Sequence, residues 1–219
     1  MMKIKLKITY QGTKTIAVPF ESEWIEEKYT DPLLVDLQKT GRIKDITIMD
    51  EMGREWNRKE YEKLKQKMES EPKNPVVYFD GGFDRDTSES GIGIVIYYEK
   101  GNATYRYRIN AKLDELETNN EAEYAALYQS LSSLEEIGMK QLPCIFRGDS
   151  QGVLKQLAGE WPCYEKTLNK WLDRIEAKIT KLGIKPSYEI ISRTENKEAD
   201  KLATQALENK IIQSHSKMV

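Results

Sequence analysis

Four acidic residues lie where helices or strands are expected to begin or end, and they are the candidates for chemistry. Asp80 follows an apolar stretch and precedes two glycines, and Asp149 follows a second apolar stretch. Glu123 and Asp200 fall in the first turns of two expected helices. Carboxylates gathered in one pocket cannot all stay ionised unless cations neutralise them. If the fold brings these four residues together, we expect them to form a metal site.

The ligand types indicate which metals such a site would hold. The chain has a single histidine, His215, in a polar C-terminal stretch, and its two cysteines, Cys144 and Cys163, do not have the spacing of a metal site. Sites with only carboxylate oxygens select hard ions. Two such ions, about 3.5–4 Å apart, are a device for cleaving phosphodiesters. We therefore predict two Mg²⁺ ions, or two Mn²⁺ ions, as cofactors.

The phase of the helix that opens at Thr118 distinguishes its two glutamates. Glu123 precedes Leu127 by four residues and so continues the apolar stripe of the helix. Glu121 shares its face with Tyr128, which we expect to be exposed. The spacing therefore predicts that Glu123 points inward and that Glu121 points toward solvent.

Each of the four acids also has a structural explanation. Asp149 can cap a helix, Asp80 can form a turn, and acids in a first helical turn interact favourably with the helix dipole. The chain contains 36 acidic residues, so any one of them is expected at the surface. The functional interpretation is favoured because small residues adjoin the acids, namely Gly81, Gly82, Ala122, Gly148 and Ala199.

Composition limits the class of protein but does not reveal a partner. The 219 residues include 34 basic and 36 acidic side chains, for a net charge of -2, so charge alone does not indicate nucleic-acid binding. No apolar run approaches the roughly 20 residues that span a bilayer, and the N-terminus alternates instead of forming a signal core. The isolated cysteines fit a reducing compartment. We expect a cytoplasmic protein that does not associate with membranes.

Breaks in the hydrophobic pattern divide the chain into four parts. Residues 1–70 read as a small α+β domain, with strands expected at 4–10, 15–20 and 43–48 and helices beginning near Asp31 and Asn57. Residues 71–75 are apolar-free apart from two prolines and are predicted to be a linker, residues 76–210 form the second domain, and residues 211–219 are a polar tail.

The second domain has the element order of an α/β fold. Strands are expected at 76–79, 91–98, 103–109, 142–146 and 188–191, and helices at 118–138, 150–157, 164–182 and 196–208. The first three strands read as an antiparallel meander, and a parallel pairing of the first and fourth would bring Asp80 and Asp149 to one edge. The order predicts a mixed five-stranded sheet with helices on both faces.

Four segments of this domain resemble the ribonuclease H type 1 family in kind and in order. The Asp-Gly pair is a weak signal by itself, whereas Thr-Asn-Asn-x-x-Glu and Glu-Asn-Lys-Glu-Ala-Asp are strong signals. The resemblance covers about residues 75–210. The segments are Asp80-Gly81-Gly82, Thr118-Asn119-Asn120-Glu121-Ala122-Glu123, Asp149-Ser150-Gln151 and Glu195-Asn196-Lys197-Glu198-Ala199-Asp200-Lys201-Leu202-Ala203.

The resemblance implies hydrolysis of the RNA strand of an RNA–DNA hybrid by two metal ions. Asp80 would bridge the ions, Glu123 and Asp149 would complete the shell of one, and Asp200 would hold the ion that activates water. Contacts near the minor groove would sense the 2′-hydroxyls that distinguish RNA from DNA. By the same resemblance the substrate-binding residues are Gly81, Gly82, Thr118, Asn119, Asn120, Ser150, Gln151 and Arg193.

Two departures from the family and one rival function stay open. The loop before Asp200 carries Arg193 where many members have a histidine, and the loop around Trp161 lacks the basic handle of some members. A proofreading exonuclease would need an acid at Gly82. The alternative from another class is a catalytically weak protein that binds hybrids or double-stranded RNA. No role is transferred to residues 1–70.

Overall fold

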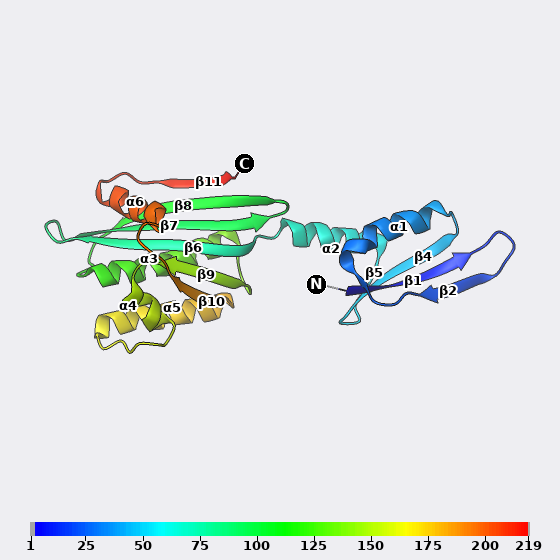
Figure 1. Ribbon diagram of the computed structural model, residues 1–219, viewed down its shortest axis with the longest axis horizontal. Helices are drawn as coiled ribbons and strands as arrows, with labels where there is room; N and C mark the ends of the chain where they lie inside the picture. The colour runs from blue at the N-terminus through cyan, green and yellow to red at the C-terminus, as the bar shows by residue number, and fades with distance from the viewer. Residues whose placement is uncertain (1–2, 219) are drawn as a thin grey trace. The chain divides into compact units, whose positions relative to one another are not determined.

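The computed structural model describes residues 3–218, which form two compact units divided between Met68 and Glu69. Each unit has its own sheet and its own apolar core (Figure 1). Residues 1, 2 and 219, which belong to the predicted first domain and tail, lie outside the described residues.

The first unit is an antiparallel sheet with helices, and its strand order is β2-β1-β4-β5 with β3 also paired to β1. Alternation in β1 sends Ile4 and Leu6 into the core, where they meet Leu34, Ile48 and Tyr61. The elements are β1 (Lys3–Gln11), β2 (Ala17–Glu21), β3 (Ile25–Glu26), the 3₁₀ helix η1 (Glu27–Tyr29), α1 (Thr30–Lys39), β4 (Ile43–Asp50), β5 (Glu55–Asn57) and α2 (Arg58–Ser70).

The sequence predicted the three longer strands and both helices of this unit but not β3 or β5. The predicted capping box is confirmed, because Asn57 Oδ1 accepts from the Glu60 N–H at 3.0 Å and Glu60 Oε2 accepts from the Asn57 N–H at 2.9 Å. The two missed strands contain only two and three residues, which is too short for a hydrophobic pattern to be visible.

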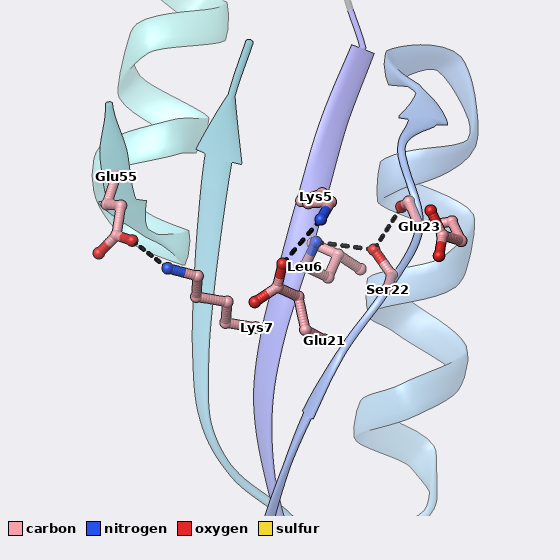
Figure 2. A network of polar contacts seen from close by, with 7 residues as sticks. All are labelled: Lys5, Leu6, Lys7, Glu21, Ser22, Glu23 and Glu55. Carbon is pink, nitrogen blue, oxygen red and sulfur yellow. Dashed lines mark hydrogen bonds and ion pairs between the residues drawn. The ribbon is translucent and has the colours of Figure 1, made fainter. Parts of the chain in front are cut away.

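Lys5 and Lys7, on the polar face of β1, are each paired with an acid of another strand of the sheet. Lys5 Nζ lies 2.8 Å from Glu21 Oε1, and Lys7 Nζ lies 2.5 Å from Glu55 Oε1 (Figure 2). Ser22 Oγ accepts from the Leu6 N–H on the same strand. The charges of Lys5 and Lys7 are therefore compensated within the first unit.

The second unit contains a six-stranded mixed sheet in the order β10-β9-β6-β7-β8-β11. The three central strands form the predicted antiparallel meander, and β9 runs parallel to both β6 and β10. The strands are β6 (Lys73–Asp84), β7 (Glu89–Lys100), β8 (Ala103–Leu113), β9 (Pro143–Gly148), β10 (Lys185–Ile190) and β11 (Gln213–Lys217).

Helices cover both faces of this sheet, as the sequence predicted (Figure 1). On one face α3 packs against the sheet and α5 packs against α3, while α6 packs on the opposite face. Glycines permit the close approach, because a Cβ at Gly81 would lie 2.2 Å from the Ala122 carbonyl carbon and a Cβ at Gly93 would lie 2.1 Å from the Ala199 carbonyl oxygen. The helices are α3 (Asn119–Ile137), α4 (Gln151–Leu157), α5 (Lys166–Leu182) and α6 (Lys197–Leu207).

The sixth strand corrects the prediction of a polar tail at 211–219. β11 pairs antiparallel with β8 and places His215 opposite Tyr107. The ring nitrogen Nε2 of His215 lies 2.5 Å from the Tyr98 hydroxyl. The segment Gln213–Lys217 is wholly polar, so no alternation marked it; its strand conformation comes from backbone pairing with the edge of β8.

The expected linker at 71–75 is also partly a strand. β6 begins at Lys73, and its register shifts between Lys73 and Val76, where Pro75 interrupts the pairing with β7. Proline cannot donate to a ladder, which explains both the irregularity and the mistaken reading of this segment. The strands expected at 76–79 and 91–98 are likewise longer than expected, because β6 ends at Asp84 and β7 begins at Glu89.

We predict that residues 69–219 fold alone. Their core is separate from that of the first unit, and the Gly101 N–H donates to the Glu69 carbonyl at 2.7 Å, so the fragment should begin at Glu69. Thermal unfolding followed by circular dichroism should show one cooperative transition, within about 5 °C of the second unit's transition in the whole chain. An insoluble or non-cooperative fragment would show that the two units depend on each other.

Candidate metal centre

Three of the predicted acids converge at one edge of the mixed sheet. Asp80 lies on β6 and Asp149 directly follows β9, and these strands are parallel neighbours. Glu123 reaches the same place from the first turns of α3. One carboxylate oxygen from each of the three residues lies within 4.8 Å of the others. The triad can therefore offer oxygen ligands to a single cation.

The fourth acid lines the same cavity but has a different partner. Asp200 lies in the first turn of α6, and its Oδ1 accepts from Arg193 Nη2 at 2.8 Å and from Nε at 3.2 Å. The cavity holds about 180 Å³, and its lining includes all four predicted acids. Its walls are Asp80, Gly81, Gly82, Asn119, Glu123, Asp149, Arg193, Asp200, Ala203, Thr204 and Leu207.

The start of α3 is placed by local chemistry. Thr118 is the N-cap residue, and its side chain accepts from the Glu121 N–H at 3.2 Å. The absence of a Cβ at Gly81 lets the backbone of Ala122 and Glu123 lie against β6. Any larger residue at Gly81 would push α3 away and separate the Glu123 carboxylate from Asp80.

Burial and like charge together raise the pKa values of two of the acids. The pKa of Asp80 is raised to about 7, first by burial and then by the charges of Asp149 and Asp200. The charge of Arg193 acts in the other direction and lowers this pKa. Burial, and then Asp80 and Asp149, raise the pKa of Glu123 well above its usual range. Glu123 is 5% exposed, and its Oε2 atom has no hydrogen-bond partner within residues 3–218. A bound cation would supply the missing partner and relieve the repulsion, so the residues fit a metal ion.

Glu121 corrects the prediction that this residue faces solvent. It is 6% exposed, and its Oε2 atom accepts from the Glu117 N–H at 2.8 Å. The phase argument separated Glu121 from the acid cluster but overlooked the chain before the helix, which covers the side chain. The carboxylate satisfies a backbone donor at the start of α3 and does not line the cavity.

The structure divides the predicted substrate-binding residues into two groups. Gly81, Gly82, Asn119 and Arg193 line the cavity, and Asn119 Oδ1 accepts from the Phe83 N–H at 3.3 Å. The others are not part of its lining and have helix-start positions beside it, so their substrate contacts stay predictions. They are Thr118, Asn120, Ser150 and Gln151.

Asn196 is a residue of the site that sequence reasoning missed. It is 1% exposed, and its Nδ2 donates to the Phe79 carbonyl at 2.9 Å and to Asp149 Oδ1 at 3.2 Å. It is the N-cap residue of α6, yet its side chain makes no capping bond. Its place in the Glu-Asn-Lys-Glu-Ala-Asp segment was the available signal. Asn196 fixes the start of α6 to β6 and orients Asp149.

Comparison with known proteins places this geometry in a family. The family described as reverse transcriptase-like matches residues 78–206, which contain all four acids. The chain belongs to the reverse transcriptase-like family. Its matched domain has the ribonuclease H fold, as a solved structure titled LC11-RNase H1 in complex with RNA/DNA hybrid illustrates. That structure matches with a TM-score of 0.56 and 30% sequence identity, over 62% of this chain and 98% of the other.

Two relatives of this chain extend the comparison. An uncharacterized protein, YpeP of Bacillus subtilis (strain 168), is 41% identical over 99% of this chain and 96% of its own length. Ribonuclease HI of Halobacterium salinarum is 31% identical over 134 residues, which are 61% of this chain and 64% of the relative. Within the described residues, no helix is both long and apolar enough to cross a membrane.

We predict that replacing Asp80 by asparagine stabilises the metal-free protein at high pH. The folded carboxyl keeps its proton up to a pKa of about 7. The unfolded chain releases it near pH 4, so the stability of the wild type falls as pH rises through this window. In EDTA at pH 8, Asp80→Asn should raise the free energy of unfolding by roughly 1–3 kcal/mol.

Urea unfolding of both proteins between pH 4 and pH 9 measures this effect. The exposed Asp173→Asn on α5 is the matched control and should follow the wild type throughout. Adding Mg²⁺ at pH 8 should raise the melting temperature of the wild type more than that of Asp80→Asn. Parallel curves for the wild type and Asp80→Asn would mean that the carboxylates do not repel each other.

Proposed function

We propose that this chain is a metal-dependent endonuclease that hydrolyses the RNA strand of RNA–DNA hybrids. The observation that carries the proposal is the convergence of buried carboxylates at the edge of a ribonuclease H fold. The similarity to a ribonuclease HI and to a ribonuclease H1 bound to an RNA/DNA hybrid supports the same activity.

Asp80, Glu123, Asp149 and Asp200 are the residues that would hold two Mg²⁺ or Mn²⁺ ions. When bound, such ions stabilise the charge that develops on a phosphate and favour the hydroxide form of a water molecule. The all-oxygen donor set and the raised pKa values of Asp80 and Glu123 support hard cations at this place.

The remaining cavity residues have roles that follow from their chemistry. Arg193, whose ion pair with Asp200 leaves its side chain 79% exposed, can leave this acid and contact a substrate phosphate. The Asn119 amide also lines the cavity and is suited to hydrogen bonds with a sugar 2′-hydroxyl. Asn196 keeps Asp149 in place without contacting substrate.

The rival function is a catalytically weak protein that binds hybrids or double-stranded RNA. A protein that only binds nucleic acid would not need all four acids, since carboxylates without cations repel the phosphates of a polyanion. The presence of four acids around one cavity therefore favours the enzyme over the binder.

We predict that cleavage needs a divalent cation and the acid set. With Mg²⁺ or Mn²⁺, the protein should cleave the RNA strand of a labelled hybrid more than double-stranded RNA or double-stranded DNA. EDTA, Asp80→Asn and Asp149→Asn should each lower the rate by roughly 100-fold or more, because each removes charge stabilisation at the phosphate. Gel analysis of products under single-turnover conditions measures the rates, and full activity in EDTA would refute the mechanism.

The two glutamates of α3 provide a matched pair for a further prediction. Glu123→Gln should reduce cleavage by roughly 100-fold, because it removes a carboxylate from the cluster. Glu121→Gln should cleave hybrid at nearly the wild-type rate, because its amide oxygen can still accept from the Glu117 N–H. Both variants are compared in the same single-turnover assay, and equal losses would show that Glu121 takes part in the site.

A further inference from the structure

The exposed face of α5 carries a continuous stripe of cations. Lys166, Lys170, Arg174, Lys178 and Lys181 follow one another at intervals of four, four, four and three residues. At 100° per residue these positions fall within an arc of about 120°, and the stripe is about 22 Å long. We refer to these five residues as the α5 basic stripe.

Few acids compensate this stripe. Glu135 on α3 is shared by Lys178 at 3.6 Å, Lys181 at 3.3 Å and Lys140 at 3.8 Å. Within residues 3–218, no ion pair joins Lys166, Lys170 or Arg174 to an acid. Unlike Lys5 and Lys7 of β1, these three cations therefore have no ion-paired acid that offsets their positive charge.

Both acids of α5 fall outside the arc of the stripe, Asp173 next to its edge and Glu176 on the far side of the helix. Asp173 and Glu176 are rotated from its centre by about 80° and 140° at helical spacing. Glu176 instead acts on Tyr188 of β10, whose pKa its charge helps to raise after burial. Neither acid therefore interrupts the stripe, whose C-terminal part borders α3.

A hollow and two aromatic rings accompany the stripe where it meets α3. The hollow holds about 300 Å³ and is lined by Tyr128, Ala177 and three cations of the stripe. Lys178 Nζ lies 5.0 Å from the centre of the Tyr128 ring, and the Arg174 guanidinium lies 5.3 Å from that of Trp171. These rings hold the cations in place on a concave surface.

The stripe begins at the end of α3 that carries the metal site. Tyr124, the neighbour of Glu123, donates through its hydroxyl to Gln156 Oε1 at 2.7 Å. Gln156 Nε2 donates at 3.3 Å to the carbonyl of Pro162, which lies four residues before α5 begins, so the start of α5 is near this end of α3. Farther along, Trp171 meets Tyr128, and Lys181 meets Glu135. The two helices therefore run in the same direction, and the stripe leads away from the acid cluster.

We propose that the α5 basic stripe binds the phosphate backbone of a nucleic acid that extends beyond the metal site. The charge is complementary, the surface is concave, and the stripe has the length of roughly six nucleotides of one strand at about 3.4 Å each. The inference rests on the proposed function in one respect: the bound nucleic acid is the one whose RNA strand is cleaved. Backbone contacts of this kind add affinity without reading sequence.

The test is binding of a fluorescent 24-base-pair hybrid in EDTA, where metal-dependent cleavage does not occur, across a series of salt concentrations. Lys170→Gln/Arg174→Gln should weaken binding about tenfold at low salt and lower the slope of log Kd against log salt by roughly 1–2. Lys100→Gln/Lys185→Gln, which removes two exposed lysines elsewhere in the second unit, is the matched control and should change neither quantity. The charge-retaining Lys170→Arg/Arg174→Lys should restore both.

Three outcomes would overturn the proposal. The first is an unchanged salt slope in the stripe variant, and the second is an equal effect in the control variant. The third is a stripe variant that loses affinity for a polyglutamate peptide, used as an acidic protein partner, but binds the hybrid as the wild type does. Melting curves of the stripe variant, whose two replaced side chains are exposed, verify its fold. Because cleavage is not measured, a stripe effect in a protein that proves inactive would refute only the proposed nuclease function.

Discussion

The repulsion among carboxylates at one edge of the mixed sheet is the constraint on which the rest of the second unit depends. Asp80, Glu123 and Asp149 are held within 4.8 Å, and burial raises the cost of keeping them charged. Such a cluster persists only where the surrounding packing stabilises the fold by more than the repulsion costs. In the metal-free protein this cost appears as the raised pKa values of Asp80 and Glu123, and a bound cation would remove it.

The packing that imposes this constraint comes from both faces of the sheet. Gly81 lets α3 lie against β6 on one face, and Gly93 does the same for α6 on the other. Asn196 then fixes the start of α6 to the sheet, because its amide bonds both the Phe79 carbonyl and Asp149. The acids are therefore placed by helix-to-sheet contacts and not by attraction within the site, which is why a site of like charges can be rigid.

The sequence predicted those parts of the molecule that depend on strong local patterns. Apolar runs located the strand that carries Asp80 and the strand that precedes Asp149, and helical phase separated Glu123 from Glu121. What escaped were features decided by tertiary contacts. β11 has no apolar residue and forms only because the edge of β8 is free to pair with it, and Glu121 is buried by the chain before α3. In the sequence Asn196 marked only the start of the last expected helix, and its bond to the Phe79 carbonyl of β6 is a tertiary contact.

The same distinction between pattern and pairing applies to charge. The whole chain is close to neutral, which at the level of composition gave no indication of a nucleic-acid partner. The balance is reached differently in each unit. On β1, Lys5 and Lys7 each meet an acid on another strand of the same sheet, so their positive charge is cancelled locally. On α5 five cations follow one another along an arc of the helix that contains no acid, and the acid cluster lies at the sheet edge. Because screening limits electrostatic interactions to about 8–10 Å in physiological salt, a polyanion at α5 senses the stripe and not the net charge. Near-neutrality of the chain is therefore compatible with a strongly charged binding surface.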